Sequence, residues 1–360
     1  AARDPTSAVE FAASVVRHGV SADDEAFRVM VRRICEATRE LNHFAHLADS
    51  LQQLPPSANS DDLVRLVAGY AAAVPAASVL ERFQQAKCQA IAGESAPVVA
   101  LLSELSPSVT SMSGPQLRAF TEVCLVADVL PDASQAKAIL RRAAALKERL
   151  SLSDTATVLC VAALARCPVD VHVEELVSSV ASQTRLIRAG ADRLAPQTVA
   201  MLLRSLHLLE KLEDDRITDF LLDRAVACRY SYSTEDCCHL LVVARTIGPK
   251  AAPLTSALTS RLRAAIPLLH PAHIGLLAQT LAVCYLRDVS VFEALSSRTL
   301  ACVDSLTSSS ALEILSAFEL ANLEPALGSK TLEALAERFR NGDADIKVEL
   351  LLWGRHLDVD

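Results

Sequence analysis

One pattern recurs six times along this 360-residue chain and dominates what it can fold into. Each copy has an apolar anchor residue, a capping or proline-containing link, and about twelve residues whose apolar positions follow helical spacing. A short break and a second amphipathic segment, such as ITDFLLDRAVACRY, then follow. The sequence therefore predicts tandem helical hairpins. The anchors, at intervals of 40, 42, 38, 37 and 37 residues, are Met112, Leu152, Leu194, Tyr232, Leu269 and Leu306.

Composition supports the same fold class. The chain has 51% hydrophobic residues but only 10 Gly and 4% aromatic residues, which favours helices over sheets. A helical hairpin cannot bury its apolar face alone, so tandem hairpins stack on one another. We therefore predict an all-α protein whose hairpins of about 37–42 residues form an α-solenoid.

The regularity of the pattern divides the chain into three parts. We predict irregular helical repeats over residues 1–110, regular hairpin repeats over 111–340, and a closing helix over 341–360. In the first part, Ser21 and Ser60 are the expected helix caps. The most loop-like stretch is LQQLPPSANSDD at 51–62, and a second weak point lies at 105–115.

The ten cysteines contain no C-x-x-C pair and lie mostly within apolar helical stretches. We expect buried, reduced thiols in a reducing compartment. No run of 18 apolar residues exists, so we expect a soluble protein without a membrane span. The chain begins at Ala1 without a methionine, so a targeting leader is expected to be missing from it.

His270, His273 and Cys284 have residue types that suit a zinc site. However, His270 occupies the position of Ser233 and Thr307 in neighbouring repeats, which indicates a helix cap. Cys284 lies about three turns after His273, roughly 16 Å along a helix and too far for a shared ion. We therefore predict no metal site.

Motifs of enzymes and cofactor sites are missing from the sequence. It contains no G-x-G-x-x-G, G-K-[ST], H-E-x-x-H or G-x-S-x-G motif. Its carboxylates, including Glu122, Glu210 and Glu313, can each be interpreted as solvated helix residues rather than a paired acid–base site. We expect no catalysis and no cofactor.

A row of five arginines follows the repeat, toward the ends of the second helices. Stacked repeats would align these side chains along one surface, where they could meet successive phosphates or bases of single-stranded RNA. They could equally complement helix dipoles and pair with local carboxylates such as Asp223, Glu293 or Glu337. The candidate RNA-binding residues, at intervals of 36, 37, 37 and 40 residues, are Arg188, Arg224, Arg261, Arg298 and Arg338.

The repeats have a family resemblance. The segment LLRSLHLLEKLEDDRITDFLLDRAV, followed by LLVVARTI and LLAQTLAVCYLRDVSVFEALSSRTL, resembles the heptatricopeptide and octotricopeptide class of organellar helical-repeat proteins, which includes the repeats that precede RAP domains. The resemblance covers about residues 112–340. It implies a mitochondrial or plastid protein of RNA processing, editing, stability or ribosome assembly. The Ala-, Arg- and Cys-rich style resembles trypanosomatid mitochondrial RNA-editing subunits.

Two functions remain open at this stage. The first is a non-catalytic mitochondrial subunit of a ribonucleoprotein complex that binds other protein subunits, single-stranded RNA, or both. The second is a protein–protein scaffold of the armadillo/HEAT type, for instance a subunit associated with the mitochondrial ribosome. The net charge of −8 favours the second, because a phosphate-binding protein needs a positive field.

Overall fold

The protein is all-α in the part of the chain that its structure, a computed structural model, describes. That part comprises residues 5–17, 19–52, 54, 57–189, 194–213, 215–321, 331, 333–335 and 337. It contains seventeen α-helices and five short 3-10 helices, and no strand. The predicted fold class is therefore confirmed.

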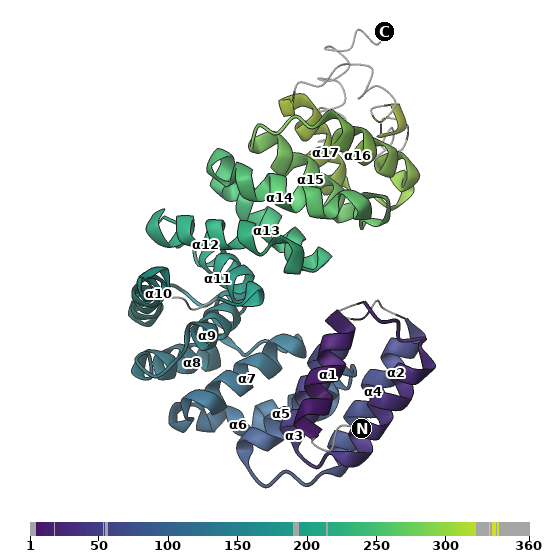
Figure 1. The fold of residues 1–360 in the computed structure, drawn as a ribbon. Helices are drawn as coiled ribbons and strands as arrows, with labels where there is room; N and C mark the ends of the chain where they lie inside the picture. Colours follow the sequence, from purple (N-terminus) through teal and green to yellow (C-terminus); the bar gives the residue numbers. More distant parts are fainter. Residues whose placement is uncertain are drawn as a thin grey trace. The chain divides into compact units, whose positions relative to one another are not determined.

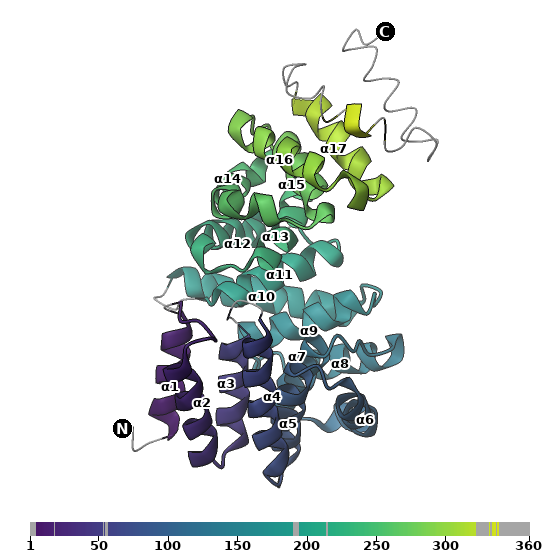
Figure 2. The ribbon, with the colours of Figure 1, turned by 90° about the vertical axis from the view of Figure 1, so that its right-hand side faces the viewer.

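The chain folds as two compact units, Ala1–Val180 and Ala181–Asp360, and helix α10 (Val171–Ala189) spans their boundary. Figure 1 and Figure 2 show the helices of each unit following one another in sequence order. The first unit contains α1 (Pro5–Arg17), α2 (Glu25–Ala37), α3 (Leu41–Leu51), α4 (Ala58–Ala73), α5 (Val79–Ile91), α6 (Ser95–Leu105), η1 (Ser106–Ser111), α7 (Gly114–Val126), α8 (Ala133–Ala145) and α9 (Leu152–Leu164). The second contains α11 (Pro196–Leu208), α12 (Asp215–Ala227), η2 (Arg229–Ser231), α13 (Thr234–Ile247), η3 (Gly248–Ala251), α14 (Ala252–Leu262), η4 (Arg263–Leu268), α15 (Pro271–Val283), α16 (Val289–Ala301), η5 (Val303–Ser305) and α17 (Ser308–Ala321).

Within each unit the odd-numbered helices form one continuous layer. In the first unit α1, α3, α5, α7 and α9 each pack on the next odd helix, and in the second α11, α13, α15 and α17 do the same. The even-numbered helices pack against this layer as the second helices of the hairpins. Aromatic pairs join neighbouring helices in both units, for example Phe83 with Phe120 and Phe292 with Phe318 in edge-to-face contact. The predicted helical hairpins are thus present.

Most regular repeats start in the same way: a buried apolar residue precedes a polar residue at the helix start, although at α11 a half-buried Leu194 precedes Ala195. Tyr232 is 1% exposed, and the next residue, Ser233, exchanges capping-box hydrogen bonds with Asp236. Ser151 does the same with Asp154, so the buried anchor of that repeat is Leu150. The prediction of Leu152 was displaced by two residues, because both leucines are buried and apolar pattern alone cannot distinguish them.

The expected caps of the irregular first part were also displaced. Helix α2 begins after Asp24, whose carboxylate accepts from the N–H groups of residues 26 and 27, whereas Ser21 lies in the preceding turn. Helix α4 begins after Ser57, and Ser60 is its third residue, completing a capping box. Stretches with several capping residue types offer more than one possible start, and packing selects one of them.

The compact units do not follow the sequence division at residue 110, which marks where the repeat pattern becomes regular. The loop-like stretch 51–62 already contains the start of α4, and 105–115 contains η1 and the start of α7. The predicted closing helix at 341–360 lies outside the described residues.

Candidate functional site

Two arginines of the predicted row, Arg224 and Arg298, contact other groups of this protein. Arg298, on α16, donates from Nε and Nη2 to the carbonyl oxygen of Leu269, at 3.1 and 2.9 Å. Arg224, in the last turn of α12, lies over the ring of Phe220 at 5.4 Å. Arg261 is exposed in the last turn of α14. Arg338 and the side chain of Arg188 lie outside the described residues.

In the first unit, Arg142 makes the same kind of contact as Arg298. The sequence analysis did not identify Arg142. Arg142, in the last turn of α8, donates from Nε to the carbonyl oxygen of Met112 at 2.7 Å. In both repeats the acceptor is the buried anchor before the first helix, and the arginine lies on the second helix, 30 or 29 residues later. That repeated spacing was the available signal. The contact ties the two helices of one hairpin together.

Charged side chains also bridge the odd helices of the first unit. The Lys87 ammonium on α5 lies 2.7 Å from Asp49 on α3 and 3.5 Å from Glu122 on α7. Arg118 continues the series, pairing with Glu122 at 2.7 Å and with Asp154 on α9 at 3.4 Å. Burial lowers the pKa of the Lys87 ammonium, but the two carboxylates together outweigh burial and leave the pKa raised. All of these residues except Asp154 line a groove of about 290 Å³ over α3, α5 and α7.

The odd helices of the second unit carry a related series. Arg245 on α13 donates to Gln279 on α15 at 2.6 Å and pairs with Glu313 on α17 at 2.9 Å. His207 lies at the end of α11, close enough to Arg245 for the guanidinium charge to act on its imidazole. Burial first, and the Arg245 charge second, lower the pKa of the His207 imidazole, which therefore stays neutral at pH 7.

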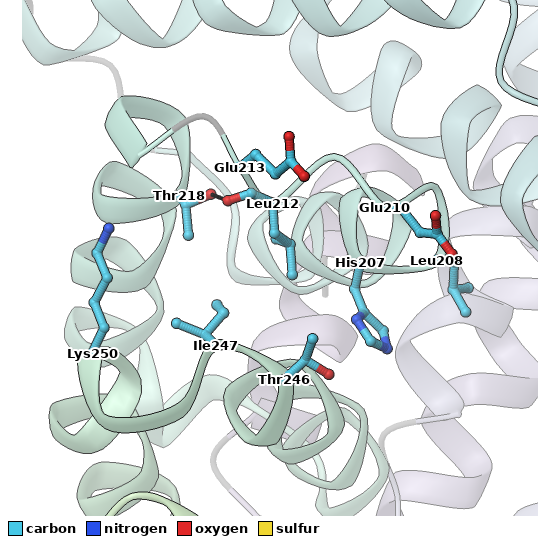
Figure 3. Close-up of a pocket in the computed structure, with 9 residues that line it drawn as sticks. All are labelled: His207, Leu208, Glu210, Leu212, Glu213, Thr218, Thr246, Ile247 and Lys250. Carbon is cyan, nitrogen blue, oxygen red and sulfur yellow. Dashed lines mark hydrogen bonds between the residues drawn. The ribbon is translucent and has the colours of Figure 1, made fainter.

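A pocket of the second unit lies where α11 and α13 end, and has a volume of about 650 Å³ (Figure 3). Its apolar lining includes Leu208, Leu212 and Ile247. Two carboxylates, Glu210 and Glu213, lie at its edge and are exposed. The volume is within the usual range for a ligand pocket, about 300–1,000 Å³.

Two further polar residues of this pocket already have partners. The Thr218 hydroxyl donates to the carbonyl oxygen of Leu212 at 3.0 Å, as Figure 3 shows. Lys250 pairs with Asp219 on α12 at 2.8 Å. Because that pairing offsets the lysine charge, Glu210 and Glu213 leave a negative field at the pocket.

The two histidines and the cysteine weighed as metal ligands lie at opposite ends of α15. His270 directly precedes Pro271, its carbonyl accepts from the His273 N–H, and the two rings lie edge to face with centroids 5.8 Å apart. The Cys284 thiol instead donates to the carbonyl oxygen of Gly248 at 3.3 Å. Across the described residues, no group of three or more His, Cys, Asp and Glu side chains is placed to hold an ion.

Comparisons with known proteins do not assign the chain to a family. No family model matches it, and no curated protein matches it. Among solved structures, it is similar to a chain described as a homology model of the full-length AP-3 complex in an intermediate open conformation. That similarity has a TM-score of 0.35 and 10% identity, and covers 99% of this chain and 74% of the other, which is too distant to support any statement about function. Separately, none of the helices in the described residues is both long and apolar enough to span a bilayer.

Proposed function

We propose that the protein is a non-catalytic scaffold, a helical-repeat subunit that binds other polypeptides of a larger assembly. The observation that carries this proposal is how cations on the helices of both units are used. Five of them, of which only Arg298 belongs to the arginine row, bond to carbonyl oxygens, amides or carboxylates of this chain, and so provide little free positive charge for a phosphate backbone. They are Lys87, Arg118, Arg142, Arg245 and Arg298.

The negative net charge points in the same direction. A protein of net charge −8 repels a polyanion unless cations gather on one surface. The surface around Lys87 and Arg118 is instead of mixed charge, with each cation beside a carboxylate. A polypeptide partner can match a mixed polar surface of this kind, because interface rims are polar and alternate in charge. A mitochondrial ribonucleoprotein as the larger assembly follows only from the family resemblance.

The test compares protein and RNA partners of the full-length chain in one experiment. The tagged protein is purified from cells that express it, after mild crosslinking, with and without ribonuclease treatment. We expect stoichiometric protein partners that survive ribonuclease, and no RNA crosslinked directly to this chain by ultraviolet light. Partners that ribonuclease releases, together with RNA crosslinks at Arg224 or Arg261, would instead establish RNA binding through the arginine row.

A further inference from the structure

We infer that the pocket at the ends of α11 and α13 receives one lysine or arginine side chain from an extended segment of a partner protein. This inference rests on the proposed scaffold function and assigns a specific site to it. Three properties of the pocket support this occupant: its charge, its apolar lining and the helix ends that border it.

The charge of the pocket selects a cation. Glu210 and Glu213 are exposed at its edge, while the one lysine of its lining, Lys250, is held 2.8 Å from Asp219. His207 adds no charge at neutral pH, because burial and Arg245 keep its imidazole neutral. Lys211 lies between the two glutamates in sequence but does not line the pocket. An anionic occupant such as a phosphate would face two carboxylates.

The helix ends strengthen the same preference. Helix α11 ends at Leu208 and α13 ends at Ile247, and both residues line the pocket. The last carbonyl groups of a helix carry partial negative charge, so the ends of two helices attract a cation. Glu210 follows the end of α11 in a left-handed conformation with φ of 55°. A carboxylate at a helix C-terminus is unfavourable for the helix itself, and a cation bound there would offset that cost.

The apolar lining selects the kind of cation. Figure 3 shows the side chains of Leu212 and Ile247 projecting toward the same space, below Glu213. Lysine and arginine bury an aliphatic stem against apolar surface while the charged group stays at the edge. The pocket therefore suits these side chains better than a small hydrated ion. An extended backbone lets one such side chain enter while its neighbours remain on the surface.

Disulfide tethering on the full-length protein tests this occupant directly. A Thr246→Cys substitution places a thiol at an exposed position of the pocket lining, in a Cys228→Ser background that removes the least buried native thiol. The probes are disulfides of Cys-Ala-Arg, Cys-Ala-citrulline and Cys-Ala-Glu peptides. A reducing agent competes with each peptide for the introduced thiol. We expect the equilibrium constant for retention of the arginine peptide to be about threefold to tenfold greater than that of the citrulline peptide, because an arginine can form two exposed charge pairs in the pocket.

Matched variants separate a pocket effect from general electrostatics. The Glu210→Gln/Glu213→Gln variant should lose the preference for arginine, whereas Glu36→Gln/Glu148→Gln, an equal change of charge at exposed sites in the first unit, should retain it. A thiol placed by Ser260→Cys, on the exposed face of α14, should show no preference. Equal retention of the three peptides at Thr246→Cys, an unchanged preference in the Glu210/Glu213 variant, or the same preference at Ser260→Cys would each overturn the inference.

The same double variant distinguishes this inference from the scaffold proposal. If the Glu210→Gln/Glu213→Gln protein keeps its full set of ribonuclease-resistant partners, and the Thr246→Cys protein with both glutamates intact shows no preference for the arginine peptide, the pocket assignment fails while the scaffold function stands. If the wild-type protein retains no protein partner at all, the scaffold proposal itself fails.

Discussion

At the scale of single residues, the ends of the first helices place ordinary side chains in a backbone conformation that favours glycine. Each of these residues has φ between 51° and 56° and lies in a turn where the next N–H bonds back to a carbonyl oxygen five residues earlier, for example Val129 to Cys124. The residues are Asp128, Arg166, Glu210 and Tyr285. The repeat therefore needs a left-handed residue after the first helix, but its sequence rarely supplies glycine there.

We expect Asp128→Gly to raise the free energy of unfolding by about 0.5–1 kcal/mol. A left-handed conformation costs about 1–2 kcal/mol for a residue with a Cβ atom, and the greater entropy of glycine in the unfolded chain removes part of the gain. The control is Lys137→Gly at an exposed position inside α8, which should lower stability by about 1 kcal/mol. Urea unfolding followed by circular dichroism measures both; equal losses in the two variants would contradict the prediction.

The cysteines are free thiols, and all except Cys228 are buried. Burial raises the pKa of four of them to about 12. At Cys237 the charge of Arg261 opposes this increase but does not cancel it. The four are Cys35, Cys88, Cys124 and Cys237. These thiols stay protonated at neutral pH, and the burial that the sequence predicted for most of the ten is confirmed.

The raised thiol pKa values predict a loss of stability at alkaline pH. Above about pH 9 the unfolded state releases thiol protons that the folded state retains, so the stabilisation is complete below that pH and falls as pH rises toward 12. Each such thiol adds about 1.4 kcal/mol per pH unit to the slope across this window. Urea midpoints at pH 7, 9 and 10.5 measure it. The slope should be shallower in Cys35→Ala, and an unchanged slope would contradict the assignment to thiols.

At the scale of helices, two glycines inside helices differ in their surroundings. A Cβ atom on Gly275 of α15 would lie 2.9 Å from the backbone oxygen of Ser310 on α17 and 2.8 Å from Glu313 Oε2. A Cβ atom on Gly69 of α4 would have no neighbour within 4 Å. Close approach of two helices therefore explains Gly275, whereas no packing contact explains Gly69.

These two sites predict opposite effects of the same kind of change. Gly275→Val should force α15 and α17 apart and lower the free energy of unfolding by about 1–3 kcal/mol. Gly69→Ala should raise it by about 1 kcal/mol through helix propensity. Chemical denaturation gives both values, and hydrogen exchange should show faster exchange along α17 only in the Gly275 variant. A stable Gly275→Val protein with unchanged exchange in α17 would mean that the two helices do not approach so closely.

At the scale of the whole molecule, the chain contains two compact units rather than one core. In an array of helical hairpins each helix contacts mainly its neighbours, so a local loss of packing weakens the unit that contains it. Leu117 on α7 and Leu277 on α15 are both fully buried, one in each unit.

We therefore expect unfolding in two separable transitions, with departure from two-state behaviour. Leu117→Ala should lower the midpoint of one transition and Leu277→Ala that of the other, each by the equivalent of about 2–5 kcal/mol. Leu300→Ala, at a residue 38% exposed, is the control and should shift neither transition appreciably. Differential scanning calorimetry measures both midpoints, and a single transition that both buried substitutions lower equally would contradict the division.

Signals within about 40 residues of sequence, namely apolar spacing, a cap and a break, are enough to specify the helical class, the tandem hairpins and the starts of most first helices in the regular repeats. Where several capping or apolar residues lay close together, as at Leu150 and Leu152, only packing selected one. The tertiary structure alone decided how side chains are shared between helices. Lys87 joins three helices, Arg245 joins α13 to α15 and α17, and the ends of α11 and α13 border a pocket. Such contacts depend on how side chains of successive helices meet in space, which the spacing of residue types within one repeat does not specify.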